Sequence, residues 1–170
     1  LKPSVSAGVM QGCNMKFIAP IFSLIFVVSC SSTGYVDSPA SRSKAIETAI
    51  LWEAELDSRW VPIDMERITK NKRLFEKTGN FFKAKSDVFA FGNKVQYLGL
   101  IGVELYAGPS ATVTGSPESV ATYIDNNYGI KLNKVGNEYI ANTKEYIRVI
   151  VSPHPSLENT TIVLGAYLGP

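Results

Sequence analysis

The spacing of hydrophobic and polar positions changes from a helical to a strand-like period near Asp87. Apolar residues between Ser41 and Ser58 recur every three to four positions, which is typical of an amphipathic helix. We therefore predict a helix from Ser41 or Ser43 to about Ser58, whose polar positions are Glu47, Glu53, Glu55 and Asp57. A second short helix is predicted over residues 64–77, closed by Gly79.

After Asp87 the alternation has a period of two, with Val, Phe, Tyr and Leu separated by glycines, as in antiparallel strands. The segment AGPS predicts a tight turn led by Pro109. One helix is expected within this region, at about 116–128, because Ser116 fits its N-cap, Pro117 its first turn and Gly129 its C-terminal end. Val120, Ile124 and Tyr128 would form its packing stripe.

These patterns together predict an α+β fold. An N-terminal helix or helix pair should be followed by an antiparallel sheet of about six to seven strands, with one helix inserted at about 116–128. The length of 170 residues favours one domain.

The N-terminal region has a different organisation. Lys16 follows Met15 and precedes twelve mostly apolar residues, 17–28, which end at the small residue Ser29. A basic start, a short apolar run and a small residue before a cut are the layout of a secretory signal. The run is too short for a membrane-spanning helix, which needs about 20 apolar residues, and Pro20 interrupts it.

The end of this run, Val27-Val28-Ser29-Cys30, resembles the lipobox of bacterial lipoprotein signal peptides. The resemblance covers residues 15–30 and implies cleavage between Ser29 and Cys30, with a covalent lipid on Cys30. It further implies a lipid anchor in the bacterial envelope; Ser31 rather than Asp after the cysteine favours the periplasmic face of the outer membrane. The remainder of the chain resembles no family that we can name.

The chain accordingly divides into four parts. Residues 1–14 are interpreted as an over-extended start, with translation beginning at Met15 or Met10, and residues 15–29 as the signal peptide. Residues 30–41 are polar, contain Gly34 and Pro39, and are expected to form a tether. Residues 42–170 should form the single folded domain.

Charge and cysteine content exclude several classes of function. Lys2 and Lys16 are the only charged residues before Cys30, so residues 30–170 retain 15 of the 17 basic residues against 15 acidic ones. A neutral domain does not predict nucleic-acid binding. No cysteine follows Cys30, and His154 is the only histidine, so we expect no metal site and no cofactor besides the lipid. The lysines near residues 70–77, diluted by Glu66 and Glu76, are read as a solvated face rather than an anion site.

Candidate catalytic residues are few, and we predict that the protein is not an enzyme. His154 lies between two prolines without a G-x-S-x-G motif to supply a nucleophile, and Glu104 lies within an apolar strand. The tyrosines are a candidate binding face. Its members, with Glu104, are Tyr97, Glu104, Tyr106, Tyr139, Tyr146 and Tyr167.

Three functions remain open. The first is a lipid-anchored envelope protein that binds another envelope component through its sheet face. The second is a glycan-binding or small-ligand-binding module that uses the tyrosines. The third is a cell-wall hydrolase centred on Glu104 or His154.

Overall fold

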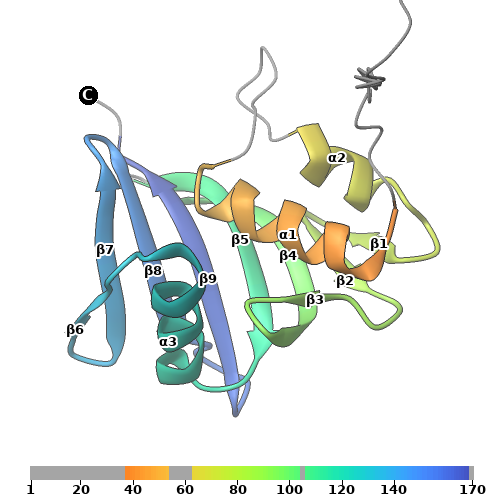
Figure 1. Cartoon of the computed structure of the whole chain (residues 1–170). Coiled ribbons are helices and arrows are strands. Elements are labelled where there is room, and N and C mark those ends of the chain that lie inside the picture. Colours follow the sequence, from red (N-terminus) through yellow and green to blue (C-terminus); the bar gives the residue numbers. More distant parts are fainter. Residues whose placement is uncertain (1–36, 54–62, 104–105, 169–170) are drawn as a thin grey trace, which may run out of the picture. The chain divides into compact units, whose positions relative to one another are not determined.

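The computed structural model describes residues 37–53, 63–103 and 106–168 (Figure 1). It confirms the predicted α+β class, with an N-terminal helix, an antiparallel sheet and an inserted helix. The helices are α1 (Pro39–Ile50), α2 (Ile63–Thr69) and α3 (Pro117–Tyr128). The strands are β1 (Phe75–Thr78), β2 (Phe81–Ala84), β3 (Phe89–Ala90), β4 (Asn93–Val103), β5 (Tyr106–Thr114), β6 (Asn133–Val135), β7 (Glu138–Lys144), β8 (Ile147–Pro153) and β9 (Thr160–Tyr167).

The sheet has nine strands among the described residues, more than the six to seven expected. Its order is β1-β2-β4-β5-β9-β8-β7-β6, with β3 paired to β4 outside this path. The added strands β1 and β2 form a hairpin in and beyond the segment predicted as a helix over 64–77. That helix ends at Thr69, and Gly79, with φ of +63°, lies in the hairpin turn instead of closing a helix. A left-handed glycine fits either role, so its presence alone did not distinguish them.

Helix α1 begins earlier and ends earlier than the sequence predicted. Ser38 is its N-cap, and the Ser38 side chain accepts a hydrogen bond from the Ser41 amide at 3.1 Å. Pro39 occupies the first turn, where its missing N–H costs nothing. The helix ends at Ile50, since Trp52 has a φ of +59°, and the predicted extension to Ser58 is therefore wrong.

Helix α3 matches its prediction closely. The Ser116 hydroxyl accepts from the Ser119 amide, Pro117 begins the helix, and Gly129 ends it in the left-handed conformation with φ of +66°. Val120 and Ile124 are fully buried, and the partly buried Tyr128 packs against the same core.

The turn predicted at Pro109 is wrong, because Pro109 lies inside β5 opposite Leu100 of β4. The pairing between β5 and β9 is interrupted at Gly108 and Pro109, and it resumes at Ser110 opposite Leu164. A proline supplies no amide hydrogen for the sheet, so it is tolerated where the ladder is broken. Trp52 Nε1 donates to the carbonyl oxygen of Gly165 at 2.9 Å near this interruption.

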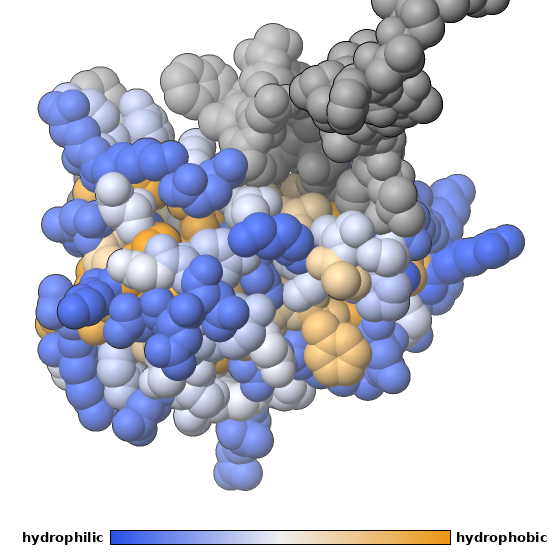
Figure 2. Space-filling view, in the orientation of Figure 1, coloured by the Kyte–Doolittle hydropathy of each residue, from blue (hydrophilic) through white to orange (hydrophobic). Residues whose placement is uncertain are grey.

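Helices α1 and α3 cover one face of the sheet (Figure 1), and α2 packs against α1. A single core joins apolar residues of α1 (Ile46, Ile50), α2 (Ile68) and α3 (Ile124) to inward-facing strand residues such as Val163. Figure 2 shows the helix-bearing side, on which hydrophilic side chains predominate. The opposite face of the sheet carries none of the described helices, and we call it the uncovered face.

Several predicted features lie outside the described residues. These are the signal segment, Ser29 and Cys30, most of the tether, Glu55, Asp57 and Glu104. Within the described part, none of the helices combines the length and the apolar character needed to cross a membrane.

Candidate functional site

The most unusual polar feature of the domain is a buried carboxylate on α1. Glu47 is 3% exposed, although the sequence pattern placed it on the polar face of the helix. That interpretation was wrong, because the β3–β4 hairpin and α3 lie against this side of α1 and supply polar partners for Glu47. A buried carboxyl group is tolerated when hydrogen bonds replace its water.

Four donors surround this carboxylate, and we call them with Glu47 the Glu47 cluster. Oε1 accepts from Ser43 Oγ at 2.9 Å and from the Phe91 amide at 2.6 Å. Oε2 accepts from the Tyr128 hydroxyl at 2.5 Å, and the Tyr123 hydroxyl lies 3.3 and 3.4 Å from the two oxygens. Since a carboxylate has about four acceptor positions, these donors fill them.

The Phe91 amide reaches Glu47 because of the turn between β3 and β4. Phe89 pairs with Lys94 and Ala90 with Asn93, which leaves Phe91 and Gly92 as a two-residue loop. Both have positive φ, +53° and +70°, as a type I′ hairpin requires. A phenylalanine in this conformation is strained. Its full burial and its bond to Glu47 offset that strain.

The two tyrosines belong to α3 and tie it to α1. Burial, reinforced by the neighbouring Glu47, raises the pKa of Tyr128 far above its usual value of 10.0, and the same causes raise the pKa of Tyr123. Both hydroxyls therefore remain protonated donors at neutral pH. The ammonium group of Lys44 lies over the Tyr128 ring, 4.2 Å from its centroid, in a cation–π contact.

The Glu47 cluster thus joins α1, the β3–β4 turn and α3 through one carboxylate. Each acceptor position faces a donor from the protein itself, so the arrangement is that of a structural connection rather than a poised acid or base. No sequence motif marks it, because Tyr128 is 81 residues away from Glu47 along the chain.

Alkaline pH should destabilise the fold through these tyrosines. Their folded-state pKa values lie above the unfolded value, so the folded state holds more protons above pH 10. The free energy of unfolding should therefore be constant below about pH 9 and fall as pH rises past 10. Urea unfolding at pH 8 to 11 measures this effect.

The matched comparison for this prediction uses Tyr128→Phe and Tyr146→Phe. Tyr128→Phe should be less stable at pH 8 and should lose less stability between pH 8 and 11, whereas Tyr146→Phe, which does not contact Glu47, should follow the wild-type curve. Identical alkaline slopes for wild type and Tyr128→Phe would show that the cluster does not cause the loss.

A scan against protein-family models finds no match for the chain, and searches of curated proteins and of solved structures find none either. Within the described residues, no group of three or more His, Cys, Asp or Glu side chains is arranged to hold a metal ion. The function must therefore be argued from the geometry of the described residues.

His154 lies in the loop between β8 and β9. Its Nδ1 accepts hydrogen bonds from the amides of Ser156 and Leu157 at 3.2 and 3.1 Å, so this nitrogen is occupied within its own loop. The structure places no described carboxylate against it in an ion pair.

The candidate tyrosines are distributed over several places. Tyr97 lies on the uncovered face of the sheet, opposite Thr112, whereas Tyr139 lies on the helix-bearing face opposite Val151 and packs against the core. Tyr106 belongs to β5, and its side chain, like Glu104, lies outside the described part of the structure.

Tyr146 and Tyr167 do come together, and Trp52 joins them. The ring centroids of Trp52 and Tyr167 are 6.1 Å apart, and those of Tyr146 and Tyr167 are 6.4 Å apart. Lys144 donates to the Trp52 carbonyl oxygen at 2.7 Å and lies 3.6 Å from Glu53. We call Trp52, Tyr146 and Tyr167 the aromatic corner.

The uncovered face of the sheet carries a strip of aliphatic side chains that the sequence analysis did not single out. Leu164 of β9 pairs with Ile150 of β8, which pairs with Ile140 of β7, so the three lie in one row on one face. Ile162 lies two residues from Leu164 on the same face. All four are half-buried. We call these four residues the aliphatic strip. Its signal in the sequence is clearest in β9, where Ile162, Val163 and Leu164 are consecutive apolar residues and therefore face both sides of the sheet.

Proposed function

We propose that this chain is a lipid-anchored protein of the bacterial cell envelope that acts by binding rather than by catalysis. In this proposal Cys30 carries the lipid, and the folded domain binds another envelope component through the uncovered face of the sheet. The lipobox-like segment 27–30 supports the anchor, since two or three acyl chains on one residue give durable membrane attachment.

The observation that carries the binding function is the aliphatic strip. A one-layer sheet usually presents polar side chains on its solvent face, whereas Ile140, Ile150, Ile162 and Leu164 cluster on three adjacent strands here. Contiguous apolar side chains on an open face are typical of a protein-binding surface.

The aromatic corner supports a second candidate, a glycan or small-ligand site. Tyr146 is 38% exposed, and a sugar ring can stack on an exposed aromatic ring. The hydrolase alternative has no comparable support, because His154 is engaged within its own loop.

A photo-crosslinking amino acid placed at Ile150 tests the proposed function in cells. We expect a crosslinked adduct to one discrete envelope protein, because Ile150 lies at the centre of the aliphatic strip. The same probe at Glu118, an exposed residue on the helix-bearing side, is the matched control and should give no adduct. A probe at Tyr146 that alone gave an adduct would favour the aromatic corner.

The lipid anchor is tested in the same strain by fatty-acid labelling and membrane fractionation. In Cys30→Ser, fatty-acid labelling should disappear, the protein should leave the membrane fraction, and the Ile150 adduct should fall with it. Labelling that persisted in Cys30→Ser would contradict the anchor, and equal adducts from Ile150 and Glu118 would contradict the binding face.

A further inference from the structure

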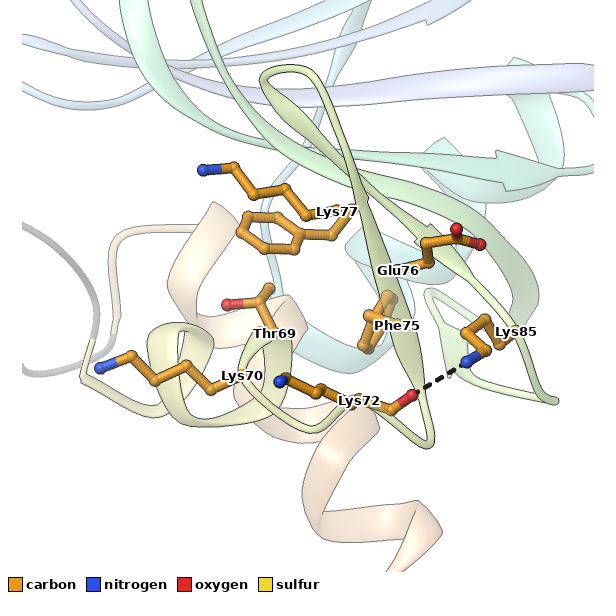
Figure 3. A pocket seen from close by; sticks show the side chains of 8 residues that line it. Thr69, Lys70, Lys72, Phe75, Glu76, Lys77 and Lys85 are labelled. Atoms are coloured by element: carbon orange, nitrogen blue, oxygen red, sulfur yellow. Dashed lines mark hydrogen bonds between the residues drawn. The ribbon is translucent and has the colours of Figure 1, made fainter.

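A lysine-lined hollow lies between α2 and the β1–β2 hairpin, away from the aliphatic strip and the aromatic corner. Its volume is about 440 Å³. The polar residues that line it are Thr69, Lys70, Lys72, Glu76, Lys77 and Lys85, and Phe75 and Phe82 provide its apolar wall. Figure 3 shows Lys70, Lys72 and Lys77 around the hollow, with Thr69 between them.

The positive charge of this hollow is only partly balanced. Lys70 forms an ion pair with Glu66 at 2.8 Å, and Lys85 donates to the backbone carbonyl of Lys72 at 3.2 Å. The ammonium groups of Lys72 and Lys77 make no hydrogen bond or ion pair with another described residue.

Glu76 also lines the hollow but forms no ion pair with its lysines among the described residues. Neighbouring strand residues point to opposite sides. Figure 3 accordingly shows the Glu76 carboxylate on the other side of β1 from the ammonium groups of Lys70, Lys72 and Lys77. The hollow therefore combines two or more available ammonium groups with an apolar wall, a combination that suits an anionic group attached to an apolar molecule.

The position of this hollow in the fold relates it to the anchor. Helix α1 begins at Pro39 at the end of the domain where β1 and β2 lie (Figure 1). The nine residues from Cys30 to Ser38 span at most ~30 Å when fully extended. A lipid on Cys30 would thus hold this end of the domain near the phospholipid headgroups.

We propose that the hollow binds the phosphate of an anionic phospholipid, with Lys72 and Lys77 contacting phosphate oxygens and the Phe82 ring contacting the glycerol. This inference rests on the proposed anchor for its geometry. Binding would fix how the domain is oriented on the membrane and would leave the aliphatic strip, on the uncovered face of the sheet, available to a partner. Lysines near an anionic bilayer each strengthen attachment roughly five-fold.

Amine-reactivity footprinting tests the proposal on the lipidated protein. The protein is reconstituted into vesicles of phosphatidylcholine alone or with phosphatidylglycerol, treated with a water-soluble acetylating reagent, and acetylation at each lysine is measured by mass spectrometry. We expect Lys72 and Lys77 to react about five-fold more slowly with phosphatidylglycerol present. Lys83 on the opposite side of β2 and Lys131 should be unaffected.

Two variants with the same change in net charge provide the control. In Lys72→Gln/Lys77→Gln the protection of Lys70 by phosphatidylglycerol should be lost, whereas Lys83→Gln/Lys131→Gln should retain it. All four lysines are exposed, so both proteins should fold, which thermal unfolding verifies.

Three outcomes would overturn the proposal. These are equal reactivity of Lys72 and Lys77 in both vesicles, equal slowing of all lysines, and full protection by inorganic phosphate in phosphatidylcholine vesicles, which would assign the hollow to free phosphate. Failure of the anchor is distinguishable, because it would appear as a missing fatty-acid label before any vesicle is used.

Discussion

Replacing Glu47 with alanine is expected to lower the free energy of unfolding by about 3 kcal/mol. The substitution removes the acceptor for the buried Phe91 amide, which sits in a strained turn and cannot reach water. It also removes the partner of the Tyr128 hydroxyl and leaves a cavity between α1 and α3. Because small domains are stable by only about 5–15 kcal/mol, much of the stability would be lost. Urea unfolding monitored by circular dichroism measures the change.

Two further variants make this prediction specific. Glu47→Gln keeps the volume and one acceptor but turns an amide donor toward other donors, so a smaller loss of about 1–2 kcal/mol is expected. Glu53→Ala, near the same helix end but exposed, should change stability by less than about 0.5 kcal/mol. If Glu47→Ala were no less stable than Glu53→Ala, the Glu47 cluster would not hold the elements together.

Gly165→Ala is expected to be strongly destabilising, with a loss of about 3 kcal/mol or more in the free energy of unfolding. A Cβ on Gly165 would lie 1.8 Å from the carbonyl oxygen of Ile50, the last residue of α1. It would also lie 2.8 Å from Trp52 Nε1, which donates to the Gly165 carbonyl. The Ile50 carbonyl belongs to the backbone of α1 and cannot rotate away as a side chain could. Helix α1 would therefore have to move away from β9. Thermal and urea unfolding measure the effect.

Gly99→Ala is the matched control, because Gly99 is also a strand glycine without a positive φ. Its Cβ would meet the Phe81 ring at 2.5 Å, but that side chain is 40% exposed and can rotate away. The loss should stay below about 1 kcal/mol. Similar losses at Gly165 and Gly99 would mean that α1 does not press on β9 as closely as the structure indicates.

The sequence predicted the fold class and the elements whose signals are local. Helix α3 carries its own N-cap, first-turn proline and terminal glycine, and strands β7, β8 and β9 lie in segments rich in Val, Ile, Thr and Tyr. Local signals did not predict the right element where the same residue type is common in two kinds of local structure. Gly79 fits a helix end and a hairpin turn equally well. Pro109 fits a turn, but the sheet accommodates it at a break in the pairing.

Much of the candidate chemistry could not be found from the sequence, since it arises from residues that meet only after folding. The pattern around α1 assigned Glu47 to solvent, because helical spacing shows that a position is polar but not whether another element covers it. Likewise, the lysines near residue 72 have the sequence pattern of an ordinary charged surface. In the fold, β1 turns Glu76 away from them and two phenylalanines form a wall beside them.

The sequence by itself thus determined the α+β class, the inserted helix and the expectation of a lipid on Cys30, since propensity, capping and a short contiguous motif depend on near neighbours. Only the tertiary structure decided that Glu47 is buried, that the residues of the aliphatic strip lie side by side, and that the lysines line a hollow. Pairing between distant strands and helix packing bring together side chains more than 80 residues apart. Burial then decides which of them connect elements inside the domain and which stay on its surface.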